Sequence, residues 1–169
     1  MKLEIVKYPE PSLKEICSRV EEITPELREI VENMIETMYE DDGVGLAAPQ
    51  IGLQKRLIVI DPSGPKERTD LQVIVNPEII SREGKVDSEE SCLSCPAFRC
   101  VIKRDEKVTV TGTDLDGNEL RIEADEFLAI VLQHEIDHLD GTLIVDRVGR
   151  LKRAMYDKKI KKWQKNPGE

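Results

Sequence analysis

The sequence has little aromatic character, very few histidines and no long hydrophobic run. Aromatic residues make up 4% of its 169 residues, and His134 and His138 are the only histidines. No stretch reaches the roughly 18 consecutive apolar residues that a transmembrane helix requires. The beginning of the chain also lacks the apolar segment of a signal peptide. These absences lead us to expect a cytoplasmic protein with no membrane partner.

The charge of the chain is unevenly distributed along its length. The formal net charge is −9, which disfavours DNA binding and other broad nucleic-acid binding. The segment 147–165 nevertheless carries nine Lys and Arg residues against one acid, whereas 1–146 carries a net −16. We therefore expect one main domain over 1–148 and a basic C-terminal helix or tail over 149–169.

This basic tail has two interpretations. In the first, it is a solvated helix that packs on the main domain through its apolar residues, which are Leu151, Met155, Ile160 and Trp163. In the second, it docks on a polyanion such as RNA.

Hydrophobic periodicity predicts an α+β domain. Thr24 and Pro25 are typical of a helix start, and the apolar stripe that follows ends near Asp42, where Gly43 is expected to break the helix. Short strands are expected over 57–62, 73–80, 106–114 and 119–123, with a polar loop over 63–71. A second helix, from Ala124 to about Asp140, is apolar almost all round. The sequence thus predicts short, mostly antiparallel strands around a buried central helix.

The central helix carries the pattern His-Glu-x-x-His, formed by His134, Glu135 and His138. Residues four apart lie on one helix face, so two imidazoles at this spacing reach a single cation. Glu135 is then placed to address a water on that cation rather than the cation itself. The alternative is a pair of ordinary core histidines, which the intervening glutamate makes a poor explanation.

A catalytic metal site of this kind needs three protein ligands and one open position. The third ligand is not a histidine, because the chain has no other, and the aspartates that follow the motif (Asp140, Asp146 and Asp157) are weak candidates. Cysteine thiolate is the natural alternative, which makes Cys92 and Cys95 the stronger candidates.

The cysteines also allow other structures. The spacing of Cys92, Cys95 and Cys100 would suit a closed structural metal site. A disulfide between Cys95 and Cys100 is a further alternative. In an extended segment, residues three apart point to opposite sides, so Cys95 is expected to face away from Cys92. On that view, Cys95 and Cys17 are small apolar fillers.

Three blocks of the sequence resemble the peptide deformylase family over roughly 1–150. The first is the glycine-rich block GVGLAAPQIG at 43–52, the second is ESCLS at 90–94, and the third is QHEIDHLDG at 133–141. The family has a glycine where this chain has Ser91. The serine side chain is expected to narrow the cleft or to force a different backbone angle.

The resemblance implies roles for the matching positions. Cys92, His134 and His138 would be the metal ligands, and Glu135 the general acid/base. The oxyanion would be bound by the side-chain amide of Gln50 and by the backbone N–H of Leu93. Substrate contacts are expected from residues around these groups, namely Val44, Gly45, Glu90, Arg99, Phe127, Ile130 and Val131. Arg99 and Arg104 would contact the substrate backbone, orient the ligand helix or lie at the surface.

The resemblance also implies an activity, a cofactor and partners. The activity is hydrolysis of the N-formyl group from the formyl-methionine of nascent proteins, in which a metal-bound water attacks the formyl carbonyl and formate is released. One divalent metal ion is expected per chain, natively Fe²⁺, with Zn²⁺ or Ni²⁺ as replacements. The expected setting is the bacterial cytoplasm, with ribosome contact through the basic tail. The alternatives are another metallohydrolase with this motif, such as a peptidase, or a non-catalytic, ribosome-associated metal-binding protein.

Overall fold

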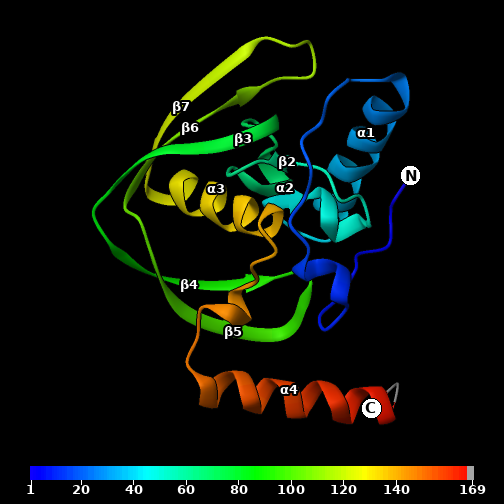
Figure 1. Ribbon diagram of the computed structural model, residues 1–169, viewed down its shortest axis with the longest axis vertical. Helices are drawn as coiled ribbons and strands as arrows, with labels where there is room; N and C mark the ends of the chain where they lie inside the picture. Colours follow the sequence, from blue (N-terminus) through cyan, green and yellow to red (C-terminus); the bar gives the residue numbers. More distant parts are fainter. Residues whose placement is uncertain (167–169) are drawn as a thin grey trace.

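The predicted central helix is confirmed in the structure, a computed structural model that describes residues 1–166. Helix α3 spans Glu126–Leu139, and Gly141, with a positive φ of 72°, follows its last turn. The helix begins later than predicted because Ala124 and Asp125 complete strand β7. Most of its side chains are buried, and Figure 1 shows it lying between two layers of strands.

One layer is a five-stranded antiparallel sheet in the order β1-β2-β3-β6-β7. Its strands are β1 (Gly45–Ala47), β2 (Leu57–Ile60), β3 (Gln72–Glu83), β6 (Lys107–Thr113) and β7 (Glu119–Asp125). The four predicted strands are all present. Strand β3 runs on through Asn76 and Pro77 by means of a register shift, with Asn76 in the left-handed region. Apolar residues of this sheet, including Ile58, Ile74 and Val110, pack against α3.

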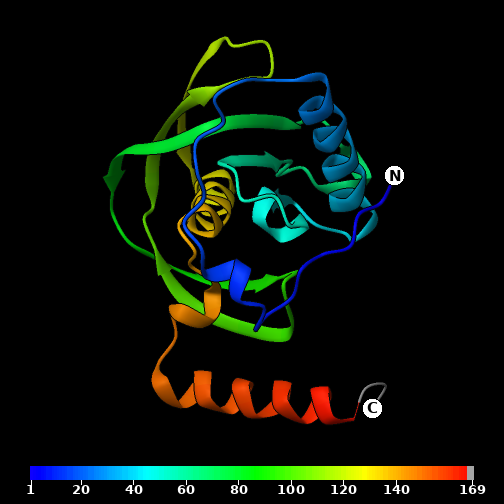
Figure 2. The same ribbon diagram turned by 45° about the vertical axis from the view of Figure 1, so that its right-hand side comes forward.

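The other layer is a two-stranded hairpin, β4 (Val86–Cys92) and β5 (Cys95–Arg104), which the sequence analysis did not predict. Strand β4 is polar along most of its length, so it gives no hydrophobic strand signal. The hairpin lies on the side of α3 opposite the larger sheet, as two views of the chain show (Figures 1 and 2). Helix α3 is therefore enclosed by strands on both sides.

Helix α1 (Pro25–Glu40) begins as predicted, with the Thr24 hydroxyl accepting a hydrogen bond from the Leu27 N–H at 3.1 Å. The residue that turns the chain after it is Asp42, with φ 58°, rather than Gly43. A short helix, α2 (Gly64–Glu67), occupies part of the predicted loop over 63–71. Short 3-10 turns lie at Pro11–Lys14 (η1), Ala48–Ile51 (η2) and Ile144–Asp146 (η3).

The basic segment forms helix α4 (Arg150–Lys165), which runs along the outside of β5. Its buried contacts come from Tyr156 and Ile160, and Tyr156 packs on the rings of Tyr8 and Phe98, with centroids 5.7 and 4.6 Å away. The expectation that Leu151 and Met155 anchor this helix is wrong, because they are 77% and 65% exposed. Tyr156, one residue beyond Met155, faces the body instead.

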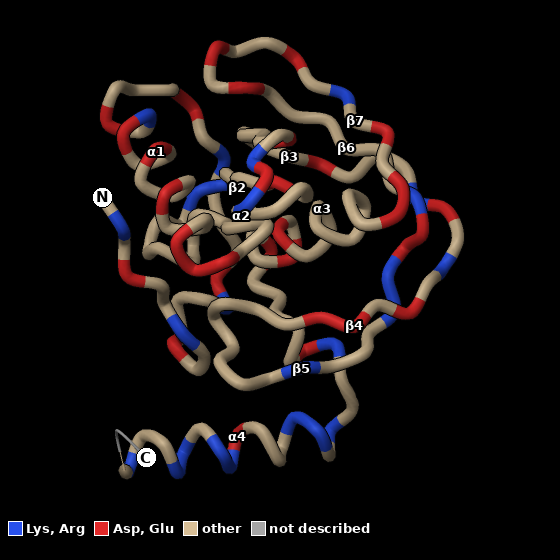
Figure 3. The backbone as a smooth tube through the Cα atoms, turned by 180° about the vertical axis from the view of Figure 1, so that it is seen from behind, with Lys and Arg blue, Asp and Glu red and all other residues tan. Residues whose placement is uncertain are grey.

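Helix α4 carries eight Lys and Arg residues against one acid, whereas acidic residues outnumber basic ones in the body beside it (Figure 3). Residues 167–169 of the expected tail lie outside the described residues. No helix within residues 1–166 has both the length and the apolar character needed to cross a membrane.

Candidate active site

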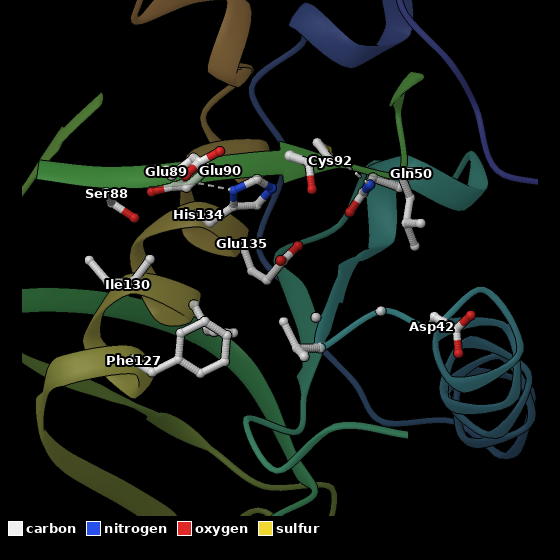
Figure 4. A pocket seen from close by; sticks show the side chains of 16 residues that line it. Asp42, Gln50, Ser88, Glu89, Glu90, Cys92, Phe127, Ile130, His134 and Glu135 are labelled. Atoms are coloured by element: carbon white, nitrogen blue, oxygen red, sulfur yellow. Dashed lines mark hydrogen bonds and ion pairs between the residues drawn. The ribbon is translucent and has the colours of Figure 1, made fainter. Parts of the chain in front are cut away.

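Helix α3 presents His134 and His138 on one face, one turn apart, with ring centroids separated by 5.2 Å. Glu135 lies between them in the sequence and is buried at 4% exposure. Its Oε1 is a buried atom with no hydrogen-bond partner among residues 1–166. Figure 4 shows this carboxylate beside His134 and Cys92, within the pocket that these residues line.

Strand β4 ends at Cys92, and this places its sulfur against the histidine face of α3. One ligating atom from each of Cys92, His134 and His138 lies within 4.8 Å of the others. The Cys92 Sγ is 3.4 Å from His138 Nε2. One thiolate and two imidazoles form a donor set that binds zinc and other first-row divalent ions. These three residues therefore fit a metal ion, and they are the expected three.

The other candidate ligands are engaged elsewhere. Asp140 pairs with Arg56 at 2.9 Å, Asp146 pairs with Lys14 and Arg153, and Asp157 accepts a hydrogen bond from the Tyr8 hydroxyl. A closed site made of three cysteines does not form either. Among the described residues, the cysteine that joins a metal-binding group is Cys92, and its companions are the two histidines.

A buried network of ion pairs contacts His134 on the side of its Nδ1. His134 Nδ1 is 2.9 Å from Glu90 Oε1, and the Arg104 guanidinium binds both Glu90 oxygens at 2.9 and 2.8 Å. Arg104 also donates to Asp137 on α3 at 2.6 Å. Burial opposes ionisation of Glu90, but the hydrogen bonds from Arg104 and His134 lower its pKa to about 2. Glu90 therefore stays a carboxylate and fixes the ring of His134, leaving Nε2 for the metal.

This network shows where the side chains of Arg104 and Glu90 lie, for which the sequence provided only expectations. Arg104 orients the ligand helix rather than lying at the surface, because its side chain is 2% exposed. Glu90 lines the pocket, but its carboxylate is occupied by Arg104 and His134. Sequence reasoning missed Asp137, although its place within the His-Glu-x-x-His motif was a usable signal.

Gln50 is held by contacts at both ends of its side-chain amide. Its Oε1 accepts from the Ala47 N–H at 3.0 Å, and its Nε2 donates to Ser94 Oγ at 3.0 Å and lies 3.7 Å from Cys92 Sγ. The Ser94 hydroxyl in turn donates to the Val6 carbonyl at 2.7 Å. The amide of Gln50 is thus fixed beside the candidate metal ligands. Sequence reasoning did not identify Ser94.

A pocket of about 360 Å³ opens over these groups. Residues from β1, its preceding loop and α3 line its apolar part, and they include the expected Val44, Gly45, Phe127, Ile130 and Val131. Leu93 and Ser91 also line it, and Ser91 is not among the residues with positive φ, so the serine side chain stands beside Cys92 without a left-handed backbone. Arg99 does not line the pocket. It is exposed and pairs with Glu89 at 3.0 Å.

The turn after Cys92 reverses the expectation for Cys95. Leu93 and Ser94 form the turn of the β4–β5 hairpin, so Cys92 and Cys95 are paired directly across it. Directly paired residues of antiparallel strands carry their side chains on the same face of the hairpin, and Cys92 packs against the apolar cluster that contains Cys95. Cys95 therefore faces Cys92, and the expectation of opposite sides fails because the chain bends between them. All four cysteines are free thiols.

Glu135 and Cys92 both line the pocket, and their surroundings shift their pKa values in opposite directions. Burial raises the pKa of Glu135. The neighbouring Cys95 thiol lowers the pKa of the Cys92 thiol well below its usual range, with further help from the two histidines and against the opposing effect of burial. Cys92 is therefore poised as a thiolate, the form that binds metals.

Comparisons with known proteins agree with this site. A family model described as polypeptide deformylase matches residues 2–154. The chain is 51% identical over 159 residues to a peptide deformylase of Thermodesulfovibrio yellowstonii, covering 94% of this chain and 96% of that one. The crystal structure of a peptide deformylase from Legionella pneumophila superposes with a TM-score of 0.91 at 42% identity, covering 98% and 96% of the two chains. That of Ehrlichia chaffeensis in complex with actinonin gives 0.88 at 36% identity and covers 98% of each.

Proposed function

The chain belongs to the peptide deformylase family, and we propose how the protein removes the N-formyl group from nascent formyl-methionyl chains. In this proposal Cys92, His134 and His138 hold the metal, and Glu135 transfers the proton. One observation carries this proposal. One ligating atom from each of the two histidines of α3 and the cysteine at the end of β4 lies within 4.8 Å of the others, beside a buried carboxylate whose Oε1 has no partner within residues 1–166.

Cys92, His134 and His138 would hold a divalent ion that, when bound, would supply Lewis acidity and lower the pKa of water toward neutrality. Fe²⁺ is the expected native ion, with Zn²⁺ or Ni²⁺ as replacements. The donor set supports all three, because imidazole and thiolate bind each of them. Glu90 supports the site from behind by holding the ring of His134 through Nδ1.

Glu135 takes a proton from the attacking water and returns it to the amine that leaves. Its position supports this role, because Glu135 lines the pocket and its buried Oε1 has no hydrogen-bond partner among the described residues. The residue is adjacent in sequence to a ligand and lies on the same buried helix. Its distance from the reacting centre is therefore fixed by the helix itself.

The negative charge that develops on the formyl oxygen needs neutral donors nearby. The Nε2 of Gln50 and the backbone N–H of Leu93 are the two groups that we assign to it. Gln50 Nε2 lies 3.7 Å from Cys92 Sγ, and Leu93 directly follows that cysteine in the hairpin turn. One such donor typically contributes about 3–4 kcal/mol to transition-state stabilisation.

The methionine side chain is proposed to occupy the apolar part of the pocket. Val44 and Gly45 form one wall, and Phe127, Ile130 and Val131 on α3 form the other. Phe127 is 51% exposed although it is a large apolar residue, which is consistent with a side chain that meets a substrate rather than the core.

The decisive experiment compares formate release with metal content in matched variants. Glu135→Gln is expected to keep one metal ion per chain and to lose formate release from a formyl-Met tripeptide. Cys92→Ala is expected to lose the metal as well, whereas Cys100→Ala keeps both. Cleavage of the Met-X peptide bond instead of formate release would favour the peptidase alternative. Full metal content with no hydrolysis of either bond would favour a binding protein.

Helix α4 is proposed to bring the enzyme to ribosomes in a bacterial cytoplasm, where its substrates emerge. The exposed lysines Lys158, Lys161 and Lys165 are available for a polyanion, since Tyr156 and Ile160 on the other face hold the helix to the body. Reversing these three charges to Glu is expected to abolish a salt-sensitive cosedimentation with ribosomes. The same change at Lys7, Lys66 and Lys107, which are exposed on the body, is the control. Equal binding by both triple variants would reject the role of α4.

A further inference from the structure

Cys92 and Cys95 close the β4–β5 hairpin from opposite strands. They are direct partners in the register, and two residues separate them. Directly paired residues of antiparallel strands have Cα atoms about 4.5–5.5 Å apart. Disulfides typically span Cα separations of about 4.4–6.8 Å. The backbone therefore already holds these two residues at a separation that a disulfide bridges, and their side chains lie on the same face of the hairpin, where Cys92 packs against the cluster that contains Cys95.

The two sulfurs differ in their access to solvent. Cys92 is half-buried and lines the pocket, so a small oxidant reaches it from there. Cys95 is 1% exposed and lies in the apolar cluster with Phe98 and Tyr156. A reagent in the pocket thus meets Cys92 first, and Cys95 stands behind it. A disulfide is apolar and suits this boundary between pocket and core.

The other two cysteines are not suitable partners. Cys100 is five residues beyond Cys95 on the same strand, which corresponds to roughly 16 Å at about 3.3 Å per residue. Its own cross-strand partner is Glu90. Cys17 belongs to a different cluster, which includes Ile136 and Leu139 of α3. The geometry singles out Cys95 as the residue that can resolve an oxidised Cys92.

We propose that Cys92 and Cys95 form a reversible redox pair in which hydrogen peroxide converts the metal-binding thiolate into a disulfide. The Cys92 thiolate attacks one peroxide oxygen, the O–O bond breaks, and Cys92 becomes a sulfenic acid as hydroxide leaves and is protonated to water. The Cys95 sulfur then attacks the Cys92 sulfur, the S–O bond breaks, and the leaving hydroxide takes the Cys95 proton. Two thiols and one peroxide yield one disulfide and two waters.

This reaction has two consequences for the site. The disulfide sulfur no longer binds the metal as a thiolate, so the ion loses one of its three ligands and is released. The disulfide also protects Cys92 from sulfinic and sulfonic acids, which thiol reductants do not reverse. The loss of metal rests on the proposed function of Cys92 as a ligand, whereas the formation of the disulfide does not.

The test uses the full chain loaded with zinc, which has no redox chemistry of its own. The protein is treated with excess hydrogen peroxide while free thiols, zinc released to a chromogenic chelator, and the mass of tryptic peptides are followed. The free thiols are expected to fall from the four in the sequence to two. The bound zinc is lost, and Cys92 is found linked to Cys95. Dithiothreitol and added zinc restore the thiols and the metal content.

Variants separate the proposal from simple oxidation of an exposed ligand. In Cys95→Ala and Cys95→Ser, Cys92 is expected to accumulate sulfinic and sulfonic acid, and dithiothreitol no longer restores zinc binding. Cys17→Ala and Cys100→Ala remove thiols outside the hairpin turn and are expected to form the disulfide as the parent does. A parent protein that keeps all four thiols, oxygenates Cys92 while Cys95 stays free, or links Cys92 to Cys100 would overturn the proposal. A Cys92–Cys95 disulfide that forms without zinc loss would uphold the redox pair but contradict the ligand role of Cys92.

Discussion

Gly45 on β1 leaves room for the side chain of Glu135 on α3. A Cβ atom built on Gly45 would lie 2.8 Å from both Cγ and Cδ of Glu135. Real Cβ atoms do not approach other heavy atoms this closely. The glycine therefore serves a close approach between the edge of the sheet and the carboxylate in the pocket, and the position of this carboxylate depends on it.

The first prediction concerns this contact. Gly45→Ala is expected to displace the Glu135 carboxylate and to lower kcat by roughly 10²-fold, since displacements of about 1 Å in a catalytic group have effects of this size. Metal content should remain unchanged, because Gly45 contacts none of the three ligands among its nearest neighbours. Formate release and bound metal are the two measurements. Gly149→Ala is the control, since a Cβ there meets nothing within 4 Å. Equal kcat values for the two variants would show that Glu135 adapts freely.

The second prediction concerns Arg104, whose buried guanidinium joins Glu90 to Asp137. Arg104→Ala leaves the Glu90 carboxylate buried without its main partner, and such losses cost about 3–5 kcal/mol of unfolding free energy. Arg99→Ala on the same strand removes an exposed pair with Glu89, which is worth about 0–1 kcal/mol. Urea denaturation of both variants measures the difference. A similar loss of stability in both would mean that the buried network contributes no more than a surface pair.

The third prediction separates the two contacts of the Gln50 amide. Gln50→Ala is expected to lower kcat by about 10²–10³-fold, the usual effect of removing one oxyanion donor. Ser94→Ala should have a smaller effect, because Gln50 keeps its hydrogen bond from the Ala47 N–H. Neither variant should change the metal content. Steady-state kinetics with a formyl-Met peptide measures both, and the assignment fails if Gln50→Ala raises KM alone.

The parts of this site that sequence reasoning recovered are those encoded locally. His134, Glu135 and His138 lie within five residues of one helix, so the helical repeat alone brings them together. The N-cap at Thr24 and the strand over 57–62 are local signals of the same kind. Cys92 comes from a distant element: the lack of other ligands left it and Cys95 as candidates, and its resemblance to a family block chose between them.

The parts that were missed depend on contacts between distant segments. The hairpin of β4 and β5 has a polar first strand, which gives no hydrophobic strand signal in the sequence. Its pairing is therefore seen only in the folded structure. Cys95 was assigned to the wrong side because the turn at 93–94 was not recognised. For helix α4, Ile160 is buried as expected, but Leu151 and Met155 were wrong anchors because the buried Tyr156 rests instead on Tyr8 and Phe98, which the sequence does not place nearby.

The fourth prediction concerns the pH dependence of stability through Asp146. This carboxylate lies in η3 and binds Lys14 of η1, Arg153 of α4 and the Leu143 N–H. Burial opposes its ionisation, but Lys14, the Leu143 N–H and Arg153 outweigh burial and lower its pKa below the ordinary value. A carboxyl whose pKa is lower in the folded state stabilises the fold above its unfolded pKa, which is about 3.9 for Asp. That contribution disappears as the pH falls through the folded pKa.

The stability of the parent should therefore exceed that of Asp146→Asn by a constant amount near neutral pH, and the difference should shrink below about pH 4. Urea denaturation of both proteins from pH 7 to pH 3 measures it, in roughly half-unit steps that resolve the pKa of an Asp. Asp87→Asn is the control, because the Asp87 pair with Lys103 is exposed on both sides. A difference for Asp146→Asn that stays constant down to pH 3 would mean that its contacts act without their charge. In that case hydrogen bonding alone, which asparagine partly retains, would hold η3 between the beginning of the chain and α4.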